Sequence, residues 1–335
     1  MKRIAVIGAG SWGTALSIVA GRAGHQVCLW SRNAEVVDEI NHHHVNSVYL
    51  KSYAVPETVR ATSDIAEAVS SADFVLLAAP SHVTRELIRR MLPSLESRML
   101  FISATKGVEI ETGKRISEIL RELLIERFEP RFVCLSGPSF AQEVAAGQPT
   151  AIVAASLSED DCLLAQTALS FENLRIYTNT DVVGTEFGGA VKNVMAVAAG
   201  MVAGLGLGAN SVAALITRGL AEMARLALAE GAQLETLMGL AGLGDLVLTC
   251  TGGLSRNRYV GQELGKGHRL EDIIKGMREV AEGVKTTRAV KLLAEKLSVE
   301  MPITNEVYAV LYEGKAVSDA AGELMLRPLR GEFEK

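Results

Sequence analysis

The feature that most constrains this chain is its opening segment, an apolar run, Ile4–Ile7, followed by a glycine loop of the form Gly-x-Gly-x-x-Gly. Gly8 permits a tight turn, Gly10 lets a pyrophosphate approach the backbone, and Gly13 lets the next helix pack closely on the strand. A helix pattern follows at once, and the N-terminus of a helix attracts anions. Strand, loop and helix in this order predict dinucleotide binding. The alternative is a structural strand–turn–helix.

Length and composition predict a globular chain with two domains. The chain has 335 residues, of which 48% are hydrophobic and 22% are charged. This length allows two separate cores, and the charged share is ordinary for a globular protein. The net charge of −5 argues against a nucleic-acid surface, so an anionic ligand must be held by local positive groups.

Cysteine usage and the N-terminus both point to the cytoplasm. The four cysteines are far apart in the sequence and form no Cys-x-x-Cys pair, which favours reduced thiols. Met1 leads almost directly into the first strand, which leaves no room for a signal or transit peptide. We therefore expect a cytoplasmic protein.

The second expected strand, Gln26–Trp30, bears on the choice of cofactor. In dinucleotide-binding folds an acidic residue after this strand binds the ribose hydroxyls of NAD. Here the sequence continues Ser31-Arg32-Asn33, with no acid, and Arg32 stands where a 2′-phosphate would lie. This predicts that NADP is preferred and that NAD is the second choice. Alternatively, Arg32 is a solvated loop residue and both cofactors are used.

Strands alternate with helices up to about residue 180. This alternation predicts an α/β fold in which residues 1–180 form a Rossmann-type, doubly wound parallel sheet that binds NAD(P). Lys106 and the loop 137–141 each follow a strand, so both should lie at the edge of the sheet where the glycine loop lies, and together form a cleft. The alternative is that Lys106 is an ordinary surface lysine. The further expected strands are Asp73–Ala79, Met99–Ala104, Phe132–Ser136, Thr150–Ser156 and Leu174–Thr178, with a helix over Glu159–Ser170.

The strand pattern stops beyond this point, and residues 181–335 are expected to form an all-helical substrate and catalytic domain. No charge occurs between Lys192 and Arg218, a length that could span a bilayer. The stretch is rich in Ala and Gly and is interrupted by glycines, which favours a buried helix pair in a core or dimer interface. The expected helices are Thr185–Gly204, Asn210–Ala229, Leu234–Leu240, Arg256–Lys266, Leu270–Met277, Lys285–Leu297 and Asn305–Tyr312.

The sequence contains one cluster of histidines, Asn41-His42-His43-His44. Consecutive residues on a helix point in different directions, and no Cys or carboxylate spacing supports a metal site. We expect a polar helix end or loop there and no bound metal.

Lys192 interrupts an apolar helix just after the predicted domain junction. A buried lysine is costly unless it is paired or functional, and burial lowers its pKa toward the range of acid–base catalysis. Asp245, in the segment Gly242-Leu243-Gly244-Asp245, could pair with this lysine and orient it. The alternative is an ion pair with a purely structural role.

The segment Ser255-Arg256-Asn257 begins a helix after a glycine turn. A hydroxyl, a guanidinium, an amide and a helix N-terminus together suit a phosphate or a carboxylate. Simple N-capping by Ser255 is the alternative. With Lys106, Lys192 and Asp245, this segment suggests a small phosphorylated substrate that faces a nicotinamide.

These motifs resemble those of bacterial NAD(P)-dependent glycerol-3-phosphate dehydrogenases over nearly the whole chain. The resemblance implies interconversion of dihydroxyacetone phosphate and sn-glycerol 3-phosphate, and a cytosolic supply of the latter for phospholipid synthesis. It also implies a homodimer without stable membrane insertion. The matching segments are 8–15 with its Ser-Trp pair, Ala104-Thr105-Lys106-Gly107, 137–141, Lys192-Asn193, 242–246 and Ser255-Arg256-Asn257.

The resemblance also implies a role for each site residue, with Lys192 as the acid–base residue and Lys106 and Arg256 in contact with both ligands. Arg32 and Tyr49 belong to loops that vary in the family. The implied cofactor contacts are Gly8, Gly10, Ser11, Trp12, Gly13, Arg32, Tyr49, Lys106, Ala141, Arg256, Val280 and Glu282. The implied substrate contacts are Lys106, Gly137, Ser139, Lys192, Asp245, Ser255, Arg256 and Asn257.

Two other functions are alternatives for a chain with these motifs. A β-hydroxyacid dehydrogenase of the same architecture typically has an asparagine four residues after the lysine. Here that position is Ala196, and the asparagine is the adjacent Asn193. A non-enzymatic NADPH-sensing regulator is the other alternative, but it would need no buried lysine beside a phosphate site.

Overall fold

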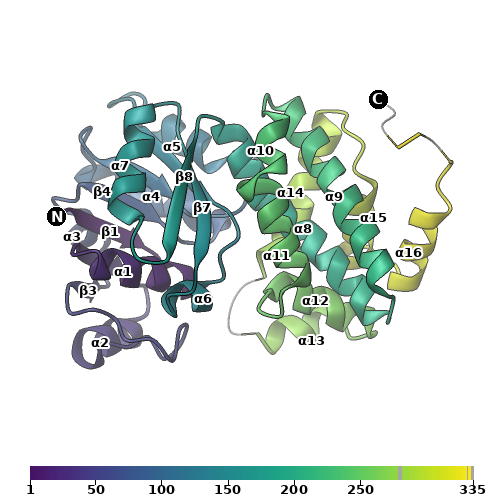
Figure 1. Cartoon of the computed structure of the whole chain (residues 1–335), viewed down its shortest axis with the longest axis horizontal. Coiled ribbons are helices and arrows are strands. Elements are labelled where there is room, and N and C mark those ends of the chain that lie inside the picture. Colours follow the sequence, from purple (N-terminus) through teal and green to yellow (C-terminus); the bar gives the residue numbers. More distant parts are fainter. Residues whose placement is uncertain (278–280, 330, 333–335) are drawn as a thin grey trace.

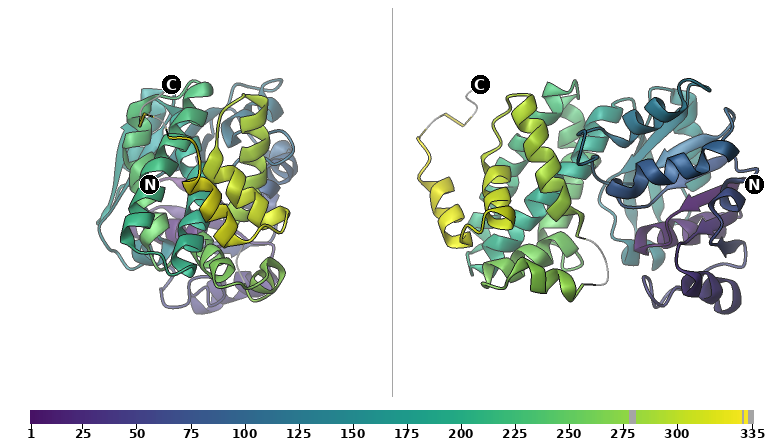
Figure 2. Two further views of the ribbon diagram at one scale, coloured as in Figure 1. Left: turned by 90° about the vertical axis from the view of Figure 1, so that its right-hand side faces the viewer. Right: turned by 180° about the vertical axis from the view of Figure 1, so that it is seen from behind.

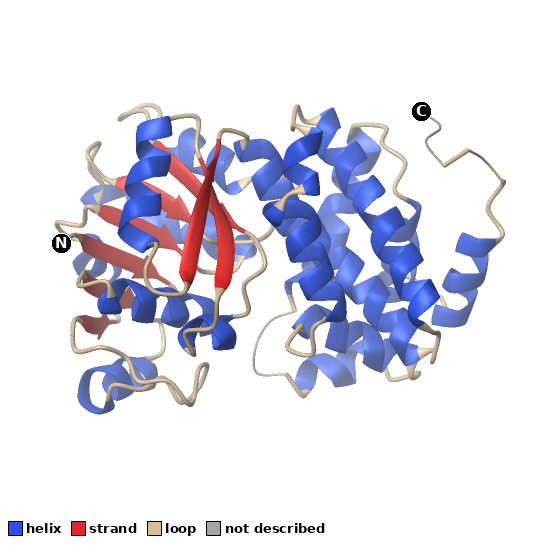
Figure 3. Ribbon diagram, in the orientation of Figure 1, coloured by secondary structure: helices blue, strands red, loops and turns tan. Residues whose placement is uncertain are grey.

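The structure is a computed structural model that describes residues 1–277, 281–329 and 331–332. Figure 1 shows two halves side by side, a layered sheet with helices and a bundle made only of helices. The N-terminus lies on the sheet half, and α16 lies on the far side of the helical half, an arrangement also seen from behind in Figure 2. Figure 3 shows that the drawn strands are confined to the first half.

The sheet has eight strands within the described residues, in the order β3-β2-β1-β4-β5-β6-β7-β8. Neighbouring strands are parallel except β6 and β7, which pair antiparallel with Ser136 opposite Val153. The predicted doubly wound sheet is therefore confirmed, but the expectation that it is wholly parallel is wrong at this junction. The strands are β1 Arg3–Ile7, β2 Gln26–Trp30, β3 Val59–Thr62, β4 Phe74–Leu77, β5 Leu100–Ser103, β6 Arg131–Ser136, β7 Thr150–Ala155 and β8 Leu174–Asn179.

Helices cover both faces of the sheet. Successive strand residues point to opposite faces, so Ile4 packs with α1, α6 and α7, whereas Ala5 packs with α3, α4 and α5. The central strand β4 is therefore apolar and buried along its whole length. The helices of this half are α1 Ser11–Arg22, α2 Ala34–His43, α3 Ile65–Val69, α4 Ser81–Met91, α5 Ile116–Leu124, α6 Ala141–Ala145 and α7 Glu159–Leu169, with a 3-10 turn at Leu92–Ser94.

The helical half is built around α8, which packs against α9, α11, α12, α14 and α15. Among the described helices, α8 is long and apolar enough to cross a bilayer, but 83% of its most apolar window is buried inside the protein. The helices are α8 Val182–Gly204, α9 Ala209–Ala229, α10 Leu234–Met238, α11 Asp245–Thr251, α12 Arg256–Gly265, α13 Leu270–Lys275, α14 Glu282–Lys296, α15 Pro302–Tyr312 and α16 Val317–Met325, with a π-helical turn at Leu240–Gly244.

Small residues let α8 and α12 approach closely. A Cβ on Gly261 would overlap the carbonyl oxygen of Val197, and a Cβ on Gly200 would overlap that of Arg258. Backbone-to-backbone packing of this kind explains why the uncharged stretch is so rich in Ala and Gly.

Several elements of the structure were not predicted, among them β3, α3, α5, α6, α11 and α16. β3 has only four residues, and α11 begins directly after a glycine-rich segment, so neither shows a clear period. α16 has one buried residue, Ala320, and thus almost no apolar stripe. The long helices α8 and α9 were predicted within three residues at each end.

Candidate active site

The glycine loop has the geometry that a pyrophosphate needs. Gly8 has φ +122°, and a Cβ on Gly13 would overlap the carbonyl oxygen of Gly8. A Cβ on Gly10 would meet nothing within 4 Å, so the space above this residue is open. α1 begins at the next residue, and no side chain caps it. The loop therefore presents a helix N-terminus to an open space, which fits the cofactor's phosphates.

Hydrogen bonds hold the segment around Tyr49 against this loop. Asn46 Nδ2 donates to the carbonyl oxygen of Ala9 at 3.0 Å, and Ser11 Oγ donates to that of Tyr49 at 2.7 Å. The indole Nε1 of Trp12 is buried and has no hydrogen-bond partner within the described residues. A buried donor without a partner is costly, so Trp12 fits a ligand that supplies an acceptor.

The remaining predicted cofactor residues are spread along the same edge. Arg32 is exposed just after β2. Burial lowers the pKa of His82, and the charges of Lys285 and then Arg32 lower it further. Ala141 is the first residue of α6. Glu282 Oε1 accepts from the backbone N–H of Ser81 at 3.1 Å, which links α14 to the start of α4. Val280 lies outside the described residues.

Lys192, Asp245 and Lys106 form the charged centre of the site. The Lys192 ammonium donates to Asp245 Oδ1, so the predicted ion pair is present. Lys106 Nζ donates to Asp245 Oδ2 at 2.7 Å and to the carbonyl oxygen of Gly137 at 3.0 Å. The Asp245 side chain is 1% exposed, and that of Lys192 is 7% exposed. One buried carboxylate therefore bridges two ammonium groups, one from each half of the protein.

This environment brings Lys192 into the range of proton exchange near neutral pH. Burial lowers the pKa of Lys192 to about 8, because charge is disfavoured away from water. Asp245 opposes this effect by raising the pKa, whereas the second ammonium group, Lys106, lowers it further. The expectation that burial lowers this pKa is confirmed.

Glu282 is the second titratable group with a strongly altered pKa at this site. Burial raises the pKa of this carboxyl to about 7, against the effects of the Ser81 N–H and of the positive charges of Arg256, Lys192 and Lys106. The charges of predicted substrate residues therefore act on Glu282, a predicted cofactor residue.

Two polar side chains at the start of α12, Ser255 and Asn257, make hydrogen bonds within the protein. Ser255 Oγ accepts from the backbone N–H of Arg258 at 3.2 Å, so Ser255 caps the helix, as the alternative interpretation supposed. Asn257 Nδ2 donates to Asn193 Oδ1 at 2.9 Å, and Asn257 Oδ1 accepts from the Gly283 N–H at 2.9 Å. Asn257 thus ties α8, α12 and α14 together.

Ser139 and Thr249 complete the polar groups around the two lysines. Ser139 Oγ donates to the carbonyl oxygen of Gly137 at 3.0 Å, so these two predicted residues lie together beside Lys106. Thr249 was not predicted: its Oγ1 lies 2.9 Å from Lys192 Nζ and donates to the backbone oxygen of Asp245 at 2.6 Å. Its signal was the spacing of four residues from Asp245, which places both side chains on one helix face.

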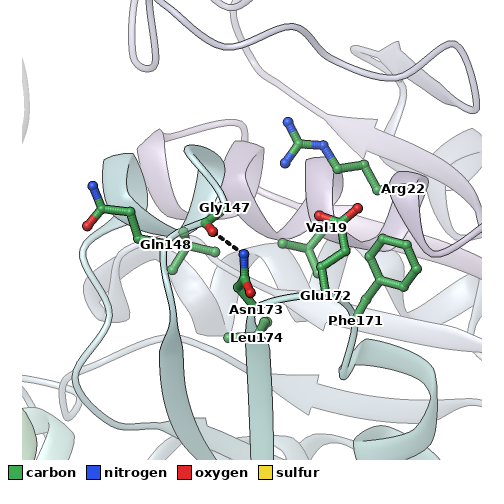
Figure 4. A pocket seen from close by; sticks show the side chains of 9 residues that line it. Val19, Arg22, Gly147, Gln148, Phe171, Glu172, Asn173 and Leu174 are labelled. Carbon is green, nitrogen blue, oxygen red and sulfur yellow. Dashed lines mark hydrogen bonds between the residues drawn. The ribbon is translucent and has the colours of Figure 1, made fainter.

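Two hollows in the surface lie elsewhere. The one in Figure 4 lies between α1 and the start of β8, is lined by Val19, Arg22 and Asn173, and holds about 10 Å³, room for roughly one water molecule. The other holds about 220 Å³ between β7, β8 and α10. Neither includes Lys192 or Asp245.

No three His, Cys, Asp or Glu side chains gather closely enough to hold a metal ion in the part of the chain that the structure describes. The histidine cluster lies at the end of α2, where the His42 ring nitrogen Nδ1 lies 2.9 Å from the carboxylate of Asp38 and His44 has φ +53°. This is a polar helix end, as predicted.

The fold and the glycine loop define a dinucleotide-binding α/β protein with a helical second half that carries a buried lysine. The chain belongs to the NAD-dependent glycerol-3-phosphate dehydrogenase family, whose N-terminal part matches residues 3–162 and whose C-terminal part matches residues 181–322. The resemblance seen in the sequence is thus confirmed.

Individual relatives match over almost their full length. Glycerol-3-phosphate dehydrogenase (NAD(P)+) of Koribacter versatilis is 57% identical over 330 residues, which cover 98% of each chain. The Myxococcus xanthus protein of the same name is 49% identical over 331 residues, 99% of each chain. The crystal structure of glycerol-3-phosphate dehydrogenase from Coxiella burnetii is 40% identical, with a TM-score of 0.93 over 97% of this chain and 99% of that one.

Proposed function

We propose that this protein reduces dihydroxyacetone phosphate to sn-glycerol 3-phosphate with NADPH or NADH. The observation that carries the proposal is the ion pair of buried Lys192 with Asp245, whose carboxylate also pairs with Lys106 at the sheet edge that holds the glycine loop. The named activity of the full-length relatives supports the same reaction.

The residues of the site have separate roles in the reaction. When bound, the dihydronicotinamide supplies a hydride to the keto carbon. Lys192, as an ammonium group, donates a proton to the oxygen that becomes the hydroxyl, and accepts it in the reverse reaction. Asp245 orients Lys192, and Lys106 adds positive charge beside the same oxygen.

The substrate phosphate is assigned to the start of α12. Arg256 offers a planar guanidinium at a helix N-terminus, and this combination suits a phosphate. We assign the other contacts as the sequence predicted them, with Gly137, Ser139, Ser255 and Asn257 beside the substrate. Binding energy from the phosphate would then hold the carbonyl in position for attack.

The cofactor contacts are proposed in the same way. The glycine loop binds the pyrophosphate, and Ser11, Trp12, Tyr49, Ala141, Val280 and Glu282 surround the rest of the cofactor. Arg32 is proposed to select NADP over NAD, because no acid follows β2 and a guanidinium is available for a 2′-phosphate. Comparison of kcat/KM with NADPH and NADH tests this choice, and a clear NADH preference would refute it.

The wider assignments follow from the same family. We propose residues 1–180 as the NAD(P)-binding domain and residues 181–335 as the substrate and catalytic domain. We further propose a cytoplasmic homodimer that supplies glycerol 3-phosphate for phospholipid synthesis. Size-exclusion chromatography with light scattering tests the dimer.

The experiment that tests the reaction is a spectrophotometric assay. NADPH absorbance is followed after addition of dihydroxyacetone phosphate, and again with β-keto acids of similar size. Turnover of the phosphate ester alone supports the proposal, turnover of an unphosphorylated keto acid supports the β-hydroxyacid alternative, and binding of NADPH without turnover supports a regulator.

Lys192→Met tests the acid–base role. The substitution keeps a long apolar side chain but removes the proton donor, so kcat should fall by at least ~10²-fold while NADPH binding persists. Cofactor binding is measured by fluorescence titration. A nearly normal kcat would remove Lys192 from the mechanism.

A further inference from the structure

The loop 104–115 carries Lys106 and lies between the two halves of the protein. We propose that Arg85 and Glu109, which touch neither Lys192 nor Asp245, are positioning residues that hold this loop and thereby fix Lys106 against Asp245. The inference rests on the proposed function, because it needs Lys106 to act at the reacting oxygen.

The residues just before Lys106 are tied to the end of β4. The backbone N–H of Ala104 donates to the carbonyl oxygen of Leu77 at 2.8 Å, and Thr105 Oγ1 donates to that of Ala79 at 2.9 Å. Thr105 is buried. This side of Lys106 is therefore held by the sheet.

The residues just after Lys106 cross to the helical half. Val108 is 1% exposed and belongs to the hydrophobic core of the helical half, where Ile110 also packs. A Cβ on Gly113 would lie 3.4 Å from Leu293 of α14. A short loop that leaves the sheet and enters the other core needs its own anchor on the sheet side.

Arg85 and Glu109 form that anchor. Arg85 Nε and Nη2, on α4, donate to the two carboxylate oxygens of Glu109 at 2.6 and 2.9 Å. Thr112 Oγ1 donates to the same carboxylate at 2.6 Å, and the Glu109 side chain is 9% exposed. Bidentate pairs of this kind fix geometry as well as charge, and one that is mostly buried is costly to break from one side.

The same arginine also offers a matched comparison. Arg85 Nη1 and Nη2 donate to Glu122 of α5 at 2.7 and 3.1 Å. The Glu122 side chain is 42% exposed, and its carboxylate also accepts from Lys114 Nζ, at the far end of the loop, at 2.6 Å. The Lys114 side chain is 41% exposed, and ion pairs between exposed side chains contribute little, so loss of Glu122 should disturb the surface but leave Lys106 in place.

Displacement of Lys106 would change the pKa of Lys192, because the positive charge of Lys106 acts on it. The titratable groups coupled to Lys192 by charge are Asp245 and Cys250 of α11, Lys106, and Glu282 of α14. Of these, Lys106 lowers the pKa of Lys192 and Asp245 raises it. When Lys106 moves away, the lowering effect is lost, so the pKa of Lys192 rises. The proton donor then stays protonated to higher pH.

The test measures kcat and KM for dihydroxyacetone phosphate reduction from pH 6 to pH 10 in Glu109→Gln, Glu109→Asp, Glu122→Gln and Lys106→Met. We expect Glu109→Gln to lower kcat/KM on the order of 10- to 10²-fold, the scale of a small misplacement of a catalytic group. We also expect the alkaline limb of the pH profile of kcat, where activity falls as Lys192 loses its proton, to move to higher pH in this variant. Glu109→Asp should recover part of the activity, and Glu122→Gln should keep the wild-type limb.

The outcomes separate the two proposals. Unchanged activity and an unchanged limb in Glu109→Gln, with an inactive Lys106→Met, overturn only the positioning role. Full activity in Lys106→Met overturns both the role of Lys106 and this inference. A loss of activity without movement of the limb indicates a merely structural pair and also overturns it. If Glu109→Gln does not fold, as judged by circular dichroism, Arg85→Lys is measured by the same criteria.

Discussion

Asp245→Asn is the most informative perturbation of the charged centre, because it removes the carboxylate and keeps the shape of the side chain. Asp245 is buried and bridges Lys192 and Lys106. Without its charge, burial and the neighbouring ammonium group both act to lower the pKa of Lys192, with no carboxylate to oppose them. We therefore expect this pKa to fall below its value of about 8 in the native site.

The size of the effect can be estimated from the protonation of Lys192. With a pKa of about 8, roughly nine in ten Lys192 side chains carry the proton at pH 7. A fall by one pH unit or more, which corresponds to about 1.4 kcal/mol or more, leaves about half or fewer protonated at pH 7. Loss of protonation alone therefore lowers the reduction rate about twofold or more at pH 7, and much less at pH 6. A further, pH-independent loss would report the lost orientation of Lys192.

The assay is the pH dependence of kcat for dihydroxyacetone phosphate reduction at saturating NADPH. The alkaline limb of Asp245→Asn should move to lower pH, opposite to the direction expected for Glu109→Gln. Glu222→Gln is the matched control, because Glu222 is a buried carboxylate elsewhere in the helical half. An alkaline limb that stays in place, or moves to higher pH, would refute the assignment of Lys192 as the titrating acid.

Three further perturbations test other parts of the structure. Arg256→Ala should raise KM for dihydroxyacetone phosphate on the order of 10- to 10²-fold, the scale of a lost charged hydrogen bond, and an unchanged KM would place the phosphate elsewhere. Gly261→Ala should lower the melting temperature strongly, because the new Cβ overlaps the Val197 carbonyl, whereas Gly253→Ala, which has open space, should not. Burial raises the pKa of Glu222 to about 7. The protonated carboxyl therefore favours the folded state, and this contribution to the free energy of unfolding is complete below about pH 4.5 and is lost as the pH rises through 7. The melting temperature of the wild type should therefore rise relative to Glu222→Gln as the pH falls from 7.5 to 4.5, and a constant difference would contradict this.

The parts of the fold that the sequence predicted well are those with a local signal. The strand Gln26–Trp30 was predicted with the bounds that the structure gives, because an apolar run between polar turns defines it. The antiparallel pairing of β6 and β7 had no such signal. The connection between them contains only the five-residue α6, and the direction of the returning strand depends on how that short helix packs.

The same distinction applies to the site. Lys192 could be recognised because a charge within an apolar helix needs an explanation, and its pairing with Asp245 followed from the need for a counter-charge. The bond from Lys106 to the same carboxylate could not be predicted. It depends on the π-helical turn Leu240–Gly244, which sets where α11 begins, and on how the helical half meets the sheet edge.

The Asp245 carboxylate, which pairs with both lysines, links the docking of the two halves of the protein to the chemistry of the site. Lys106 comes from the sheet half, whereas Lys192 and Asp245 come from the helical half. Without the sheet half, Asp245 would keep one ammonium partner, and the pKa of Lys192 would lie higher, because the lowering effect of Lys106 would be absent. The loop 104–115 bridges the same boundary through Val108 and Glu109. Correct docking of the two halves is thus the condition under which Lys192 reaches the protonation equilibrium that the reaction needs, so a substitution at their interface can change the pH profile without touching either ligand.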